Sequence, residues 1–235
     1  MSELFSIQLQ NRQQQGRDGV WLDLPTTTEQ VQAALRQIGI SSDNPQGLFI
    51  SGYFAEEEKR FAIPYNMVLA SNVDELNFLA SRLETLSTGE RAELNAALQA
   101  PQSELFSIGR ITDFPENVDY YVHLPDVHGP AQLGDYYLNR SGMVDMPEEW
   151  KGGIDTAQFG RYVAQQEQGA FTQYGYLVKS GDEWQKVHEG QPVPEEYRVT
   201  PQPPQPERPD PSKVEMDAAA PGQKTAQTAE QPQEL

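Results

Sequence analysis

The first forty residues carry two alternating apolar segments followed by one segment with helical periodicity. Apolar side chains occupy every second position over residues 5–9 and 20–24, and a polar stretch containing two glycines separates the two runs. Strict alternation is typical of half-buried strands, so we predict two neighbouring strands. Thr26 and Glu29 then stand at capping-box spacing, and apolar residues recur at helical intervals as far as Gly39. This pattern predicts a helix between Thr26 and Gly39.

The pattern changes from alternating to helical in the second quarter of the chain. Residues 48–53 are predicted to form a third strand, which completes a ββαβ domain over residues 1–63. Between residues 72 and 100 the apolar positions follow helical spacing only. Two pairs of residues at capping-box spacing mark the expected helix starts, namely Asn72 with Glu75 and Ser87 with Glu90. Pro101 ends the segment, so we predict a helical middle domain over residues 64–101.

One hexapeptide, Ser-Glu-Leu-Phe-Ser-Ile, occurs twice, at residues 2–7 and 103–108. The first copy continues by alternation, whereas Leu105, Ile108 and Ile111 in and after the second copy lie three residues apart. We predict a strand for the first copy and a helix for the second.

The third quarter mixes strand and helix patterns, which predicts an α+β domain over residues 102–198. The expected elements are a strand over 120–124, helices over 132–139 and 155–166, and a hairpin of 171–178 with 184–187 joined through 180–182. Asp155 is expected to be the N-cap of the second helix, with Phe159, Tyr162 and Val163 pointing inward. The predicted fold class is therefore α+β, in three small domains.

Composition limits the remaining possibilities. After Val199 the chain has eight Pro and six Gln in 36 residues and no aromatic residue, so we predict that residues 199–235 are a disordered tail. The absence of cysteine excludes disulfides and thiolate metal sites. The start of the chain lacks a signal-peptide pattern and no stretch is long enough to span a membrane, so a cytoplasmic protein is expected.

The net negative charge of the chain indicates which kind of molecule it can bind. The 29 acidic residues of positions 1–198 exceed the 14 basic residues by 15, whereas residues 199–235 contribute a surplus of only 3. The negative charge therefore belongs to the part of the chain that is predicted to fold. Such a surface favours positively charged protein partners and disfavours nucleic acid and anionic membranes.

Several segments in order along the chain resemble the ArdA family of antirestriction proteins. They are Trp21-Leu-Asp-Leu-Pro25, residues 28–39, residues 74–83, Leu133-Gly-Asp-Tyr-Tyr-Leu138, Met146-Pro-Glu148, Ile154-Asp155, Phe159-Gly-Arg161 and residues 169–172. The resemblance implies an elongated, acidic, three-domain homodimer encoded on mobile DNA. It further implies a mimic of the bent DNA that Type I restriction-modification enzymes hold in their methyltransferase core, without direct nucleic-acid binding, in the cytoplasm of a bacterial host.

The candidate contact residues are acids in clusters or on expected outer faces. They are Glu56, Glu57, Glu58, Asp74, Glu84, Glu93, Asp113, Glu116, Asp119, Asp126, Asp135, Asp145, Glu148, Glu149 and Glu167. Glu75, Glu90 and Asp155 are interpreted as capping residues instead. Glu56–Glu58 can equally be a solvated loop, because Lys59 and Arg60 follow at once.

The resemblance also implies a role in antirestriction, and in some members in dimer contact, for residues 133–147. The candidate residues there are Leu133, Tyr136, Tyr137, Leu138, Arg140 and Met143. This chain has Asn139-Arg140 where its relatives tend to carry acids. Arg140 is a candidate for pairing across a dimer interface.

We consider two other classes of function, an enzyme and an acidic adaptor. An enzyme or metal site finds little support, since only His123, Asp126 and His128 lie close together in a spacing typical of no zinc site, and no nucleophile elbow or phosphate-binding loop is present. We therefore expect no enzymatic activity, metal or cofactor. The second class is an acidic adaptor that binds some other basic DNA-binding protein, which requires the same charge.

Overall fold

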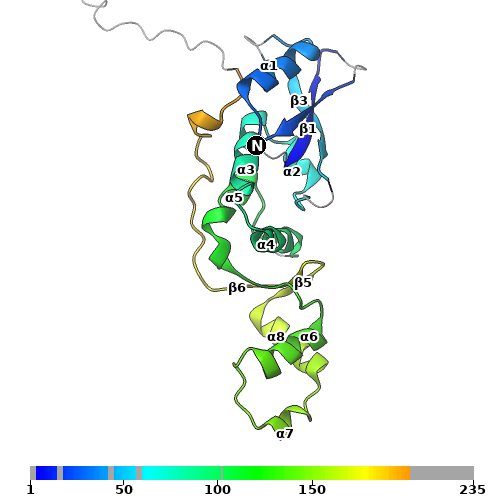
Figure 1. Cartoon of the computed structure of the whole chain (residues 1–235), viewed down its shortest axis with the longest axis vertical. Helices are drawn as coiled ribbons and strands as arrows, with labels where there is room; N and C mark the ends of the chain where they lie inside the picture. The colour runs from blue at the N-terminus through cyan, green and yellow to red at the C-terminus, as the bar shows by residue number, and fades with distance from the viewer. Residues whose placement is uncertain (1–3, 15–17, 42–44, 57–59, 102, 202–235) are drawn as a thin grey trace, which may run out of the picture. The chain divides into compact units, whose positions relative to one another are not determined.

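The two alternating segments at the N-terminus and residues 48–54 form a three-stranded antiparallel sheet (Figure 1). The computed structural model describes residues 4–14, 18–41, 45–56, 60–101 and 103–201, all within one compact unit. Strands β1 (Phe5–Asn11), β2 (Val20–Leu24) and β3 (Leu48–Phe54) pair in the order β2-β1-β3. Every second side chain of β1 is buried, as its alternation predicted.

Helix α1 (Thr28–Gln37) follows β2 and buries Val31, Ala34 and Leu35 in the core that the sheet also lines. The predicted cap was wrong by one residue, because Thr27 is the N-cap and forms a capping box with Gln30. Thr26 is buried, and its backbone N–H donates to Asn77 Oδ1 at 2.7 Å. That tertiary hydrogen bond holds Thr26 outside the helix.

The predicted helical segment contains α2 (Tyr65–Leu69), α3 (Val73–Leu83) and α4 (Thr88–Gln99). Both predicted capping boxes are confirmed, with Asn72 and Glu75 starting α3 and Ser87 and Glu90 starting α4. Helix α3 lies at the centre of the core, since seven of its eleven residues are buried.

The two copies of the hexapeptide have different conformations, but the helix predicted for the second copy is wrong over most of its length. The first two residues of the first copy lie outside the described residues, and β1 begins at Phe5. In the second copy α5 (Ile108–Thr112) begins only at the last residue. Two serine hydroxyls accept backbone N–H groups there, Ser103 from Leu105 and Ser107 from Arg110. The Ser103 bond competes with helical hydrogen bonds, whereas Ser107 is the N-cap of α5 and fixes the point where that helix begins.

A second antiparallel sheet has the order β4-β6-β5, with β4 (Tyr121–Leu124), β5 (Ala170–Thr172) and β6 (Gly175–Lys179). Two 3-10 turns, η2 (Phe114–Glu116) and η3 (Val118–Tyr120), lead into β4. The predicted hairpin was misplaced, because the chain turns within residues 171–178 and residues 184–187 form no strand. Gly175 has φ +120°, which permits the turn between β5 and β6.

The segment between β4 and β5 holds α6 (Pro130–Asp135), the π-helical turn η4 (Tyr136–Arg140), α7 (Glu148–Lys151) and α8 (Thr156–Glu167). Asp155 is the N-cap of α8, as predicted. The inward placement of Tyr162 is wrong, since this residue is 60% exposed. Gly160 instead faces α6, where a Cβ atom would lie 1.8 Å from the carbonyl oxygen of Pro130.

Two apolar cores support these elements. The larger one includes residues from Leu4 to Val199 and reaches both sheets, while the smaller one is centred on Val127, Leu133 and Tyr176. The predicted boundaries after residues 63 and 101 stay predictions. The predicted tail lies outside the described residues except for its first three, of which Val199 is buried. Within the described part of the chain, no helix is long and apolar enough to cross a membrane.

Candidate acidic partner-binding surface

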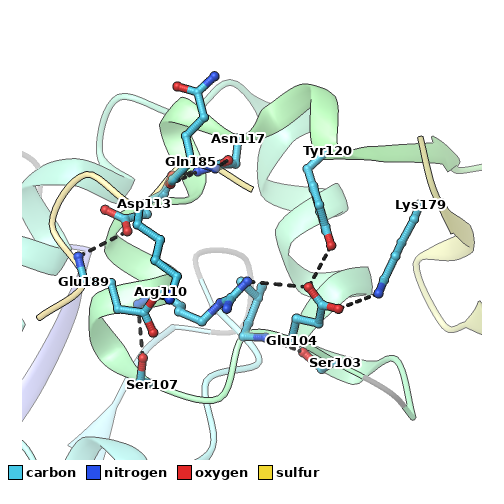
Figure 2. Close-up of polar contacts among 12 residues, drawn as sticks. Ser103, Glu104, Ser107, Arg110, Asp113, Asn117, Tyr120, Lys179, Gln185 and Glu189 are labelled. Carbon is cyan, nitrogen blue, oxygen red and sulfur yellow. Dashed lines mark hydrogen bonds and ion pairs between the residues drawn. The ribbon is translucent and has the colours of Figure 1, made fainter. Parts of the chain in front are cut away.

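The chain after β6 runs back along α5 and α3 as an extended segment, residues 180–201, which we call the C-terminal strap (Figure 1). Asp113 at the end of α5 anchors it. This side chain is fully buried, and its carboxylate accepts the backbone N–H groups of Val187 at 3.3 Å, His188 at 2.6 Å and Glu189 at 3.1 Å. Figure 2 shows the bond to Glu189. The carboxylate of Asp113 is therefore used inside the protein.

Other side chains receive the strap in the same way. Asn117 bonds Gln185 twice, through its Oδ1 at 2.7 Å and its Nδ2 at 3.0 Å (Figure 2). Asp74 Oδ1 accepts the N–H groups of Val199 and Thr200, both at 2.8 Å. Two of the predicted contact acids, Asp74 and Asp113, thus hold backbone of the strap. The short 3-10 turn η5 (Glu195–Tyr197) lies between these anchors.

Glu104 is the centre of a charged cluster that sequence reasoning missed (Figure 2). Its carboxylate bonds the ammonium of Lys179, accepts the hydroxyl of Tyr120 at 2.7 Å and lies 3.5 Å from Arg110 Nη2. The hydrogen bond from Lys179, followed by that from Tyr120, holds the pKa of Glu104 below its ordinary value. Its partners come from three separate elements, so no local sequence signal identifies this residue.

Glu93 on α4 differs from the other candidate acids, because burial raises the pKa of its carboxyl to about 8. The nearby carboxylates Glu90 and Asp119 raise the pKa further. Oε1 of Glu93 is buried and has no hydrogen-bond partner among the described residues. At neutral pH this side chain is mostly uncharged, so it adds little to a negative surface.

Replacing Glu93 with glutamine is expected to remove part of the pH dependence of stability. The pKa is about 8 in the folded chain against an ordinary value of 4.5, so the folded state binds a proton more tightly and stability falls as pH rises between these values. Relative to the unchanged protein, the variant should gain about 3 °C in Tm between pH 5 and pH 9, after allowance for partial exposure. Thermal melts at both values measure this, and an equal offset at both would contradict it.

Four of the predicted acids are committed to contacts within the chain. Glu116 pairs with Arg82, Asp135 with Arg140 at 3.2 Å and Glu148 with Lys151 at 2.7 Å. Glu167 accepts the hydroxyls of Tyr137 at 2.5 Å and Tyr176 at 3.0 Å. Burial, followed by the hydrogen bond to Glu167, raises the pKa of Tyr137.

The remaining predicted acids that the structure describes lie wholly or partly at the surface. Asp119, Asp126, Asp145 and Glu149 are exposed, as is Glu56, while Glu84 is half-buried. Glu57 and Glu58 lie outside the described residues. Further exposed acids that we did not single out from the sequence are Asp18, Asp23, Glu29, Asp182, Glu183, Glu195 and Glu196. Exposed acidic side chains therefore occur near the N-terminus, in the segments around β4 and α7, and on the strap.

The segment around η4 separates into buried and exposed side chains. Leu133 and Leu138 are buried, and Tyr136 and Tyr137 are half-buried. The guanidinium of Arg140 lies 5.7 Å from the ring centre of Tyr136, in addition to its pair with Asp135. Met143 is 75% exposed, and Trp150 on α7 and Tyr162 on α8 are also exposed large apolar residues.

The described residues contain no cluster of three or more His, Asp or Glu side chains that could hold a metal ion. His123 Nε2 lies 2.7 Å from the carbonyl oxygen of Tyr174. The imidazole of His123 is thus hydrogen-bonded to the backbone just before β6.

Comparison with known proteins identifies the family. No curated protein matches the chain. The family described as "Antirestriction protein (ArdA)" matches residues 15–178, which is more than half of the 235 residues. The match begins after β1, includes β2, β3 and the helices from α1 to α8, and ends at Val178 near the end of β6, before the C-terminal strap. The chain therefore belongs to the ArdA family of antirestriction proteins.

Proposed function

We propose that this protein inhibits Type I restriction-modification enzymes by occupying their DNA-binding groove as an acidic mimic of duplex DNA. The observation that carries the proposal is the surplus of 15 negative charges in residues 1–198 of a chain that belongs to an antirestriction family. A groove that binds DNA is lined by Lys and Arg side chains, which a negative protein surface complements. The proposed setting is the cytoplasm of a bacterial host.

The exposed acids are the proposed counterparts of DNA phosphates. Asp119 precedes β4, Asp126 follows it, Asp145 precedes α7 and Glu149 lies in α7. All four are exposed and carry carboxylates that can approach a basic groove. Buried Asp113 and the mostly neutral Glu93 do not belong to this set, because neither presents a negative charge to solvent.

We further propose that the protein is a homodimer whose contact includes the exposed apolar side chains near η4. Met143, Trp150 and Tyr162 are 75%, 68% and 60% exposed. Large apolar side chains gathered in one segment are typical of protein contacts. Light scattering should give twice the mass of the chain, and Trp150→Ser with Met143→Ser should shift the mass toward that of one chain. A monomeric unchanged protein would exclude the dimer.

Competition for DNA tests the proposed function. The full chain is added to a Type I methyltransferase core bound to labelled cognate DNA, over a series of salt concentrations. We expect displacement at low salt that weakens as salt rises, since charge pairs between the proteins are screened. If no displacement occurs at low salt, the alternative is an adaptor for another basic DNA-binding protein. Direct binding to a histone-like protein under the same conditions then tests that alternative.

A further inference from the structure

A groove lies between the C-terminal strap and helices α3 and α5. It has a volume of about 480 Å³, and its lining includes Glu75, Phe78, Ile108 and the strap residues 188–193. A second hollow of about 450 Å³ shares Glu75 and residues 107–109 and opens toward Met67 and Phe106. We call the two together the strap groove. Its strap wall lies beyond residue 178, and so outside the part of the chain that the family match covers.

The strap wall of the groove is held in place by buried polar contacts. Asp113 accepts three consecutive N–H groups of residues 187–189, as described above, and Figure 2 shows Glu189 held beside Asp113. Phe78 packs against His188 and Tyr197, with ring centres 4.9 Å and 4.7 Å apart. A Cβ atom at Gly109 would lie 3.2 Å from the Cα atom of Glu189, so glycine permits this close approach. These contacts fix the strap wall of the groove against α3 and α5.

The walls of the groove are apolar and its charged groups are acidic. Phe78, Ile108, Pro192 and Val193 provide apolar surface beside several polar residues. Glu75, which also accepts the N–H group of Asn72 in its capping box, and Glu189 provide carboxylates. Oε2 of Glu189 is buried, accepts no hydrogen bond from the described residues and pairs with Lys186 Nζ at 3.4 Å. A side chain with an aliphatic stem and a cationic head matches this arrangement, because the stem contacts apolar walls and the head contacts carboxylates.

We propose that the strap groove binds an arginine or lysine side chain of the basic partner protein. That the cation comes from the partner's DNA-binding groove rests on the proposed function, whereas the capacity to bind such a cation rests on the groove itself. The groove would give this chain a contact that the family-matched part alone does not form, since the strap provides half of the lining of its first hollow.

Titration with n-butylguanidinium, observed by NMR on the full chain, tests the groove alone. We expect saturable shifts of the backbone amide signals of Gly109 and Gly190, and no such shifts with the neutral analogue N-butylurea at the same ionic strength. The double variant Glu75→Gln, Glu189→Gln should bind the cation roughly tenfold more weakly. Glutamine at position 75 can keep the capping box, as Gln30 does in α1. Equal shifts with both compounds, or shifts elsewhere only, would overturn the proposal.

Competition with DNA on the methyltransferase core then tests the source of the cation. The double variant should compete roughly tenfold more weakly than a control that loses the same charge outside the groove, Glu183→Gln with Glu195→Gln. Both control residues are exposed strap acids. Equal losses in the two variants would refute the groove contact while leaving the proposed function intact. Failure of the unchanged protein to compete would refute the proposed function, and the titration would still decide whether the groove binds a cation.

Discussion

Replacing Asp113 with asparagine should lower the free energy of unfolding by about 3 kcal/mol. The Asp113 side chain is fully buried, and its two oxygens accept three backbone N–H groups from the C-terminal strap. Asparagine has nearly the same shape, but its amide NH₂ group would face N–H donors and leave at least one of them without an acceptor. The strap should then detach from α5 in part of the population.

Urea unfolding measures this loss as a lower midpoint at an unchanged slope. Asp126→Asn serves as the matched control, because it makes the same chemical change at an exposed position and should alter stability by less than about 0.5 kcal/mol. Hydrogen exchange should in addition be faster at the amides of residues 187–189. If Asp113→Asn is as stable as the control, the carboxylate does not hold the strap.

Neutralising Asp119, Asp126, Asp145 and Glu149 together, with asparagine or glutamine, should weaken competition with DNA on the methyltransferase core by roughly 100-fold at low salt. Each exposed carboxylate that meets a Lys or Arg side chain contributes up to about 1 kcal/mol, and four such losses amount to about 2–3 kcal/mol. The dependence on salt should become less steep, because fewer charge pairs remain to be screened. The same competition series provides the measurement.

A control with the same loss of charge separates a patterned surface from net charge alone. Asp18, Glu183, Glu195 and Glu196 are exposed acids outside the predicted set, and their neutralisation changes the net charge equally. We expect this control to weaken competition less than tenfold. Equal effects of the two variants would mean that bulk negative charge suffices, and the proposed matching of carboxylates to phosphate positions would be wrong.

Local signals predicted the elements that depend on neighbouring residues. The alternation of β1 and β2 and the capping boxes at Asn72 and Ser87 were read correctly, because these patterns act within a few residues. The errors fell where distant residues decide. Residues 184–187 resemble a strand, yet Asn117 and Asp113 hold the backbone there as part of the strap. The hexapeptide copies diverge because the first pairs with β2 and β3 as part of β1, whereas the second leads into α5 through its N-cap Ser107.

Local sequence patterns likewise did not predict which acidic residues are buried. Asp113 and Asp126 both flank the segment that leads into and out of β4, yet one is fully buried and the other is exposed. The difference arises because the strap, more than 70 residues later in the chain, supplies N–H groups to Asp113. Residues from other elements likewise lower the pKa of Glu104, and burial in the folded chain raises that of Glu93.

The sequence by itself determined the negative charge of residues 1–198, the local starts of most helices and strands, and the ordered motifs that resemble the ArdA family. Net charge is a sum over residues, and the other two properties are patterns of neighbouring residues, so all three follow from the sequence alone. Only the tertiary structure decided which carboxylates face solvent, which hold the strap and which are neutral. Burial and hydrogen bonding depend on residues that fold together from far apart, and those contacts determine where the charge can act.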